Sequence, residues 1–226
     1  MGSFLTNYHV RSDSPESVVS ALQLIVRSKA CVSPSKNGWV TVYDETSESQ
    51  DDKELHRIAK EVSSRLGCVT LAFLVHDSDV LAYLLYEKGN LADEYNSKPD
   101  YFGPSDDATR QRYRGRTEVL LKLCATGTRP SEVERILGHG RGDDSQYAFE
   151  EDRLRELAAL LGIDEDRACI GFNYYEHGDL EDIGGFRTLG KRGRFEDANR
   201  QGRKRKKNDN GDSGHSLQGW TSHVGR

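Results

Sequence analysis

Two short apolar runs separated by four polar residues constrain the fold more than any other stretch of this chain. The runs are CVTLAFLV (68–75) and VLAYLLYE (80–87), and both are rich in residues that favour strands. The separator, HDSD, is typical of a turn, because Asp and Ser side chains bond nearby backbone amides. The sequence therefore predicts a β-hairpin here.

The residues before the hairpin alternate between strand and helix patterns. The first predicted helix has Ser14 as N-cap and Pro15 at its first position, and the second begins near Asp51 and ends at Gly67. The predicted strands are 4–11, 39–45, 68–75, 80–87 and 91–96. The order β-α-β-α-β-β predicts an α+β fold, in which two helices cover a mostly antiparallel sheet of four or five strands.

Beyond residue 102 the apolar spacing becomes helical, and it disappears near residue 186. Three short helices cannot bury a large core of their own, so they are expected to pack on the sheet or on one another. The predicted organisation is an α+β domain at 1–102, a small helical lobe at 103–186 and a disordered basic tail at 187–226.

The net charge of −5 conceals a split between body and tail. Residues 187–226 hold eleven basic and four acidic residues, which leaves 21 basic and 33 acidic residues in 1–186. The tail is therefore +7 and the body −12. Such asymmetry predicts a tail that acts separately, by binding polyanions or by serving as a targeting signal.

The tail has the layout of a bipartite nuclear localisation signal, with ten residues between two basic clusters. The alternative is a general polybasic tether for nucleic acid. The residues predicted to act in targeting or nucleic-acid binding are Lys191, Arg192, Arg203, Lys204, Arg205, Lys206 and Lys207.

Cysteine usage and the N-terminal residues indicate an intracellular protein. None of the four cysteines forms a C-x-x-C pair, and their spacing suits no zinc site. The first residues lack a signal-peptide pattern, and no apolar run reaches the roughly 20 residues of a membrane span. We expect a cytoplasmic protein without membrane partners, or a nuclear one if the source is eukaryotic.

The stretch GNLADEYNSKPDYFGP (89–104) mixes tyrosines with carboxylates, as recognition loops do. It could instead be a stiff linker held against the helical lobe by aromatic side chains. The residues predicted to bind a protein partner are Asp93, Glu94, Tyr95, Asp100, Tyr101 and Phe102.

Two further clusters define alternatives. Carboxylates and a histidine near the ends of predicted strands could hold Mg²⁺ or Mn²⁺ for phosphoester chemistry if two of those strands pair in parallel. The candidate metal ligands are Asp44, Glu45, His76, Asp77 and Asp79. The segment RQRYRGR (110–116) could grip phosphates, or its arginines could neutralise the acidic body.

Three segments together resemble an uncharacterised group of bacterial α+β proteins over roughly residues 37–165. They are GWVTVYDE, VHDSDV and LADEYNSKPDYF. The group has no established activity, so the resemblance implies no site residues. The basic tail lies outside it.

These patterns favour a non-enzymatic protein-interaction module whose tail directs it to nucleic acid or the nucleus. No complete catalytic constellation is recognisable in the sequence, and no cofactor is predicted. The alternatives are a metal-dependent phosphoester enzyme and a nucleic-acid-binding protein. The sequence does not specify an oligomeric state.

Overall fold

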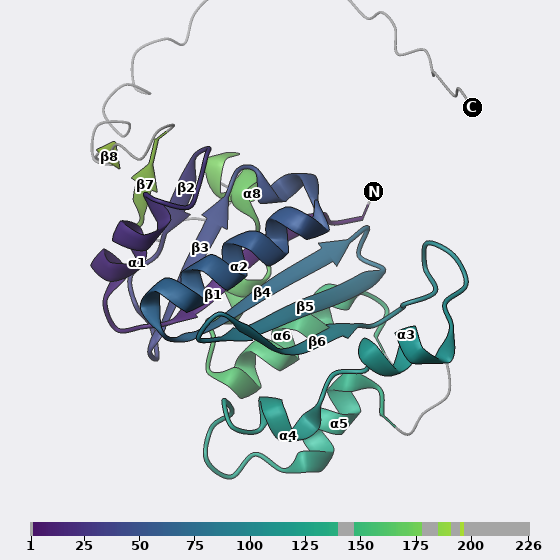
Figure 1. Cartoon of the computed structure of the whole chain (residues 1–226). Coiled ribbons are helices and arrows are strands. Elements are labelled where there is room, and N and C mark those ends of the chain that lie inside the picture. The colour runs from purple at the N-terminus through teal and green to yellow at the C-terminus, as the bar shows by residue number, and fades with distance from the viewer. Residues whose placement is uncertain (1, 140–146, 178–184, 191–194, 197–226) are drawn as a thin grey trace, which may run out of the picture.

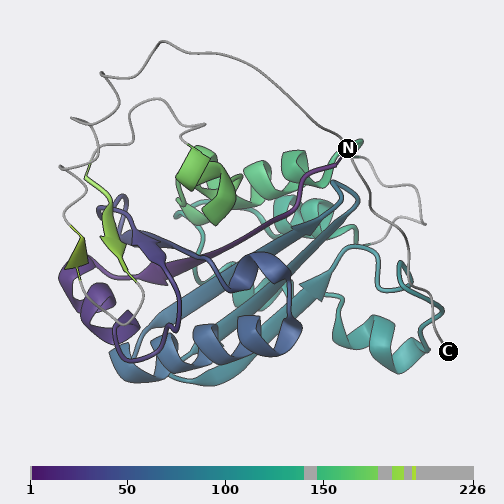
Figure 2. The same cartoon turned by 90° about the horizontal axis from the view of Figure 1, so that it is seen from above.

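One antiparallel sheet lies between two layers of helices in the computed structural model (Figures 1 and 2). The structure describes residues 2–139, 147–177, 185–190 and 195–196. Helices α1 and α2 cover one face of the sheet, and the helices that follow β6 lie mainly on the other. The α+β class predicted from the sequence is confirmed.

Within the described residues, eight strands form the sheet, in the order β6-β5-β4-β1-β3-β2-β7-β8. Each neighbouring pair is antiparallel. The strands are β1 (Leu5–Arg11), β2 (Ala30–Val32), β3 (Trp39–Asp44), β4 (Val69–His76), β5 (Val80–Glu87), β6 (Asn90–Asn96), β7 (Arg187–Leu189) and β8 (Phe195–Glu196).

The predicted number of strands, four or five, is too low, because β2, β7 and β8 were not predicted from the sequence. Each has only two or three residues, too few to show an alternating pattern. Strand β7 pairs with β2, although the sequence placed residues 187–189 in a disordered tail. Beside β7, the ring of Phe186 stacks on Tyr43 at a centroid distance of 5.8 Å.

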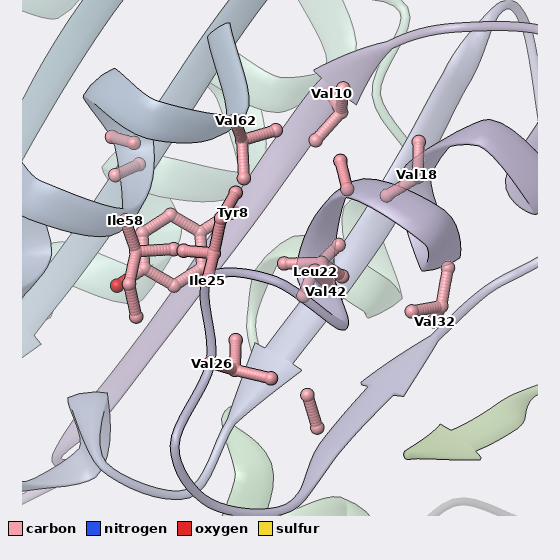
Figure 3. Close-up of a cluster of buried hydrophobic side chains, with 14 of the residues drawn as sticks. Tyr8, Val10, Val18, Leu22, Ile25, Val26, Val32, Val42, Ile58 and Val62 are labelled. Atoms are coloured by element: carbon pink, nitrogen blue, oxygen red, sulfur yellow. The ribbon is translucent and has the colours of Figure 1, made fainter. Parts of the chain in front are cut away.

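The first helical layer consists of α1 (Pro15–Leu22) and α2 (Asp52–Leu66). Both helices begin at their predicted N-caps, and α2 ends at the predicted glycine. The Ser14 side chain accepts a hydrogen bond from Ser17 N, and Gly67 ends α2 with a φ of 63°. Apolar side chains from both helices meet Tyr8 and the valines of β1 and β3 in one buried cluster (Figure 3).

The second helical layer closes the opposite face of the sheet, which is why the strands are buried on both sides. Its apolar side chains form a continuous cluster with Leu71, Phe73 and Tyr83 of the sheet. Its helices are α4 (Thr117–Leu120), α5 (Pro130–Leu137), α6 (Glu150–Leu161), α7 (Glu165–Ala168) and α8 (Phe172–His177), and they are preceded by the surface helix α3 (Asp107–Arg112). No helix in the described residues is long and apolar enough to cross a membrane.

Polar side chains of β1 connect the sheet to this second layer. Asn7 Nδ2 donates to the carbonyl oxygens of Ala168 and Ile170, at 2.6 and 2.8 Å. Asn7 Oδ1 therefore faces His9 Nε2 as an acceptor, at 2.9 Å. The remaining ring nitrogen, Nδ1, lies 3.1 Å from Thr41 Oγ1 and accepts from it. Hydrogen bonding thus selects the neutral Nε2–H tautomer of a fully buried histidine.

Candidate functional site

The turn between β4 and β5 lies at the centre of the candidate site. Asp77 and Ser78 have φ values of 51° and 57°, and Asp79 N donates to His76 O at 3.0 Å. Two successive left-handed residues are typical of a type I′ turn, which matches the twist of a hairpin. The hairpin predicted from the sequence is therefore confirmed, and its polar turn projects beyond the sheet.

The chain's N-terminal segment and α6 hold this turn from two sides. Ser3 N donates to Ser78 Oγ at 2.8 Å, and Ser78 N donates to Ser3 O at 3.1 Å. From the other side, Glu150 N donates to Ser78 O at 2.9 Å. The Ser78 hydroxyl also donates to Glu151 Oε1 at 2.7 Å. The position of the turn is fixed by hydrogen bonds to elements far apart in the sequence.

Four rings gather beside the turn, and we call Phe4, His76, Tyr101 and Phe102 the aromatic surface. The His76 ring contacts each of the others edge-on, at centroid distances of 4.8, 5.8 and 5.1 Å respectively. Phe4, Tyr101 and Phe102 are 42%, 38% and 77% exposed. Large apolar side chains are normally scattered singly on a surface, so this contiguous group of rings is a candidate interaction site.

A hydrogen bond with Gln50 sets the orientation of the His76 ring. Its Nδ1 lies 2.7 Å from Gln50 Oε1, and Gln50 Nε2 donates to Val75 O at 2.7 Å. Because the amide oxygen is an acceptor, His76 Nδ1 acts as the donor. This hydrogen bond orients the ring at the centre of the aromatic surface.

A cavity of about 270 Å³ adjoins the turn on the side that faces α6. Its lining consists of Gly2, Asp77, Ser78, Asp79, Ala148 and Phe149. Phe149 is 60% exposed and occupies the N-cap position of α6, where its side chain makes no capping bond. Sequence reasoning missed this residue, although an apolar side chain directly before the acidic start of a helix is an unusual N-cap.

The six residues predicted to bind a partner divide into two groups. Asp93, Glu94 and Tyr95 lie in β6 and are 3–7% exposed. Asp100, Tyr101 and Phe102 lie in the exposed loop that follows. Only this second group is accessible at the surface.

The buried group has partners within the chain. Asp93 Oδ2 accepts from Tyr83 Oη at 2.7 Å and from Arg116 N at 2.9 Å. Burial, together with the Asp93 carboxylate, raises the pKa of Tyr83 well above its usual value. Tyr95 stacks on Tyr83, and its hydroxyl accepts a hydrogen bond from Arg153 Nη1 at 2.7 Å. These contacts give both β6 residues a structural role.

Three of the four arginines of RQRYRGR pair with acidic residues that precede them. Arg112 Nε lies 2.5 Å from Glu94 Oε1, and Arg116 Nε lies 3.3 Å from Asp93 Oδ1. Arg110 Nε lies 3.1 Å from Asp100 Oδ2 and, with Ser105, holds the pKa of that carboxyl below its usual range. Of the two readings of this segment, the contacts favour neutralisation of the acidic body.

The candidate metal ligands share one end of the sheet, but the strands that carry them do not pair. Strand β1 lies between β3, which ends at Asp44, and β4, which ends at His76. The parallel pairing on which the metal hypothesis depended is therefore wrong. Among the described residues, no group of three or more His, Cys, Asp or Glu side chains is arranged to hold a metal ion.

Each of these carboxylates has a local role instead. Asp44 is buried and accepts from Ser47 Oγ at 2.9 Å, while burial raises its pKa. Glu45 Oε2 accepts from Lys29 N at 3.2 Å, and Asp77 Oδ1 accepts from Gly2 N at 3.1 Å. Asp79 Oδ1 lies 3.1 Å from Lys98 Nζ.

The tail residues predicted for targeting lie outside the residues that the structure describes. They are Lys191, Arg192, Arg203, Lys204, Arg205, Lys206 and Lys207. Comparison with known proteins adds no relative, since the chain matches no protein-family model, no curated protein and no solved structure.

Proposed function

We propose that the protein is a non-enzymatic interaction module and that a protein partner docks on the aromatic surface. The observation that carries the proposal is the gathering of exposed rings around His76, with Phe102 77% exposed. Phe149, 60% exposed, lines a cavity on the same β4–β5 turn and supplies a second exposed ring near it. Aromatic side chains are enriched in interfaces and supply much of the binding energy.

The same rings are suited to binding because they are already ordered. Tyr101 and Phe102 meet edge-on at a centroid distance of 4.9 Å, and the fixed His76 ring contacts both. Ordering side chains on association costs roughly 0.5–1.5 kcal/mol for each flexible group. A surface that is ordered beforehand loses less of its binding energy to this cost.

Replacing Phe102 by serine tests the proposal. A partner captured by the intact protein should bind the Phe102→Ser variant about 30-fold more weakly, as expected for a central aromatic anchor worth roughly 2 kcal/mol. Leu24→Ser is the matched control, because Leu24 is 71% exposed and lies outside the aromatic surface. Equal loss of binding in both variants, or no loss in either, would contradict the proposal.

The tail supplies the second part of the proposal, which is delivery to nucleic acid or to the nucleus. Its support is the charge split between a tail of +7 and a body of −12. Binding to duplex DNA should weaken with salt, with a log–log slope of about −0.9 for each phosphate neutralised. Removing residues 197–226 keeps β7 and should make that slope shallower, because Arg203 to Lys207 are lost while Lys191 and Arg192 remain. A fluorescent fusion would show separately whether nuclear accumulation needs the same residues.

A further inference from the structure

The cavity beside the β4–β5 turn combines three features that single out one kind of side chain. It has a volume of about 270 Å³, room for one long side chain rather than a folded domain. Asp77 and Asp79 contribute carboxylates, and Phe149 contributes a ring that is 60% exposed. The cavity also shares the β4–β5 turn with the aromatic surface, since Asp77 directly follows His76.

The side chains around the cavity carry a net negative charge, even when the described ion pairs are included. Asp77, Asp79 and Glu151 bring three carboxylates, and Lys98 brings one ammonium, 3.1 Å from Asp79. The other contacts of these carboxylates are neutral donors: Gly2 N reaches Asp77 Oδ1 at 3.1 Å, and Ser78 Oγ reaches Glu151 Oε1 at 2.7 Å. Counted over the described residues, these carboxylates outnumber the Lys98 ammonium and the partial positive charge at the N-terminus of α6, so a cation entering here is attracted.

The ring of Phe149 complements such a cation. Arginine and lysine carry apolar stems that pack on rings, and their charged groups are attracted to the ring face. At the N-cap of α6, the phenyl group provides no capping bond, whereas Ser or Asp there would add roughly 1 kcal/mol of stability. A binding role accounts for this locally unfavourable choice.

We infer that the cavity is an anchor pocket for an arginine or lysine of the partner's docking segment. The inference rests on the proposed function and deepens it by naming the partner's chemistry. Apolar side chains of the same segment contact the aromatic surface, while the basic side chain enters between Phe149 and the two aspartates. The bound segment therefore combines a basic residue with apolar neighbours.

Selection from a display library of random twelve-residue peptides on the full chain tests this. Selected peptides should be enriched in arginine or lysine next to apolar residues. Their Kd should rise roughly threefold with Asp79→Asn, as for a partly exposed charge pair, and further with Asp77→Asn added. Asparagine suits both sites, because it accepts hydrogen bonds and tolerates the φ of 51° at position 77. Glu134→Gln, an exposed change on α5, is the control.

The outcomes separate the two proposals. Peptides that depend on Phe102 but lack basic residues, or that ignore both aspartate variants, overturn the anchor pocket and leave the interaction surface standing. Peptides indifferent to Phe102→Ser overturn the proposed surface. If no peptide is enriched on the full chain, both proposals fail.

Carbodiimide coupling of the unliganded full chain examines the two other possible occupants. The expected product at Asp79 joins it to Lys98, its neighbour at 3.1 Å. A bond from Asp77 or Asp79 to a lysine within 203–207 of the same chain would mean that the tail fills the pocket. A bond between two chains would mean that a second copy does. Either product overturns the assignment to a separate partner.

Discussion

Acid should destabilise this protein through one buried histidine. His9 is fully buried, and burial lowers its pKa from 6.5 to about 3. In the unfolded chain His9 binds a proton below about pH 6.5, whereas the folded protein keeps it neutral down to about pH 3. The unfolded state then holds more protons, so the free energy of unfolding falls as pH falls through this window.

The size of the effect follows from the two pKa values. Each pH unit between them corresponds to about 1.36 kcal/mol. At pH 5 the loss from His9 is therefore about 2 kcal/mol, and by pH 3 it is about 4 kcal/mol. Since whole domains are stable by only about 5–15 kcal/mol, this histidine alone can dominate acid unfolding.

Urea titrations of the wild type and of His9→Gln between pH 7 and 4.5 measure the effect. Glutamine can still donate to Asn7 and accept from Thr41, so the variant should lose roughly 1–2 kcal/mol at pH 7 and show less dependence on pH. The difference between the two proteins should shrink by about 2 kcal/mol from pH 7 to pH 5. His177→Gln, at an exposed position, should keep the wild-type profile. Parallel profiles for wild type and His9→Gln would refute the reasoning.

Three other substitutions test the structural roles assigned above. Phe186→Ala should cost about 3 kcal/mol and speed amide exchange in β7, measured by hydrogen–deuterium exchange, because it removes a ring stacked on Tyr43. Asp93→Ala should cost roughly 2 kcal/mol in urea titrations, because it leaves the buried Tyr83 hydroxyl without its acceptor; an unchanged midpoint would contradict its structural role. Phe102→Ser should leave the thermal midpoint within about 2 °C of wild type, since the ring is 77% exposed.

The sequence predicted the framework of the fold because its signals are local. Caps at Ser14 and Gly67 and the turn after His76 can each be read from a few neighbouring residues, and the structure confirms them. The burial of both faces of β1 could not be read this way. From the sequence, its polar residues Asn7 and His9 would be expected to face solvent. In the structure they are covered by a helical layer formed by residues more than 100 positions further along the chain.

The candidate site, too, could be predicted only in part from the local sequence. Tyr101 and Phe102 were predicted within a loop, and the structure confirms their exposure. Asp93 and Glu94 are instead buried side chains of the edge strand β6, where arginines 18 to 23 residues further along the chain pair with them. Local composition does not reveal which carboxylate has a partner. Local composition also does not reveal the surroundings of His76. The sequence predicted it as a candidate metal ligand, whereas in the structure it lies at the centre of a cluster of aromatic rings.

Site-specific photo-crosslinking tests the central claim most directly. A benzophenone side chain is introduced at position 102, within the aromatic surface, or at position 24, which is 71% exposed and outside it. After irradiation in cells, the account predicts a discrete cross-linked protein species from position 102 and none from position 24. The same species from both positions, or none from position 102, would contradict the claim that the aromatic surface binds a partner.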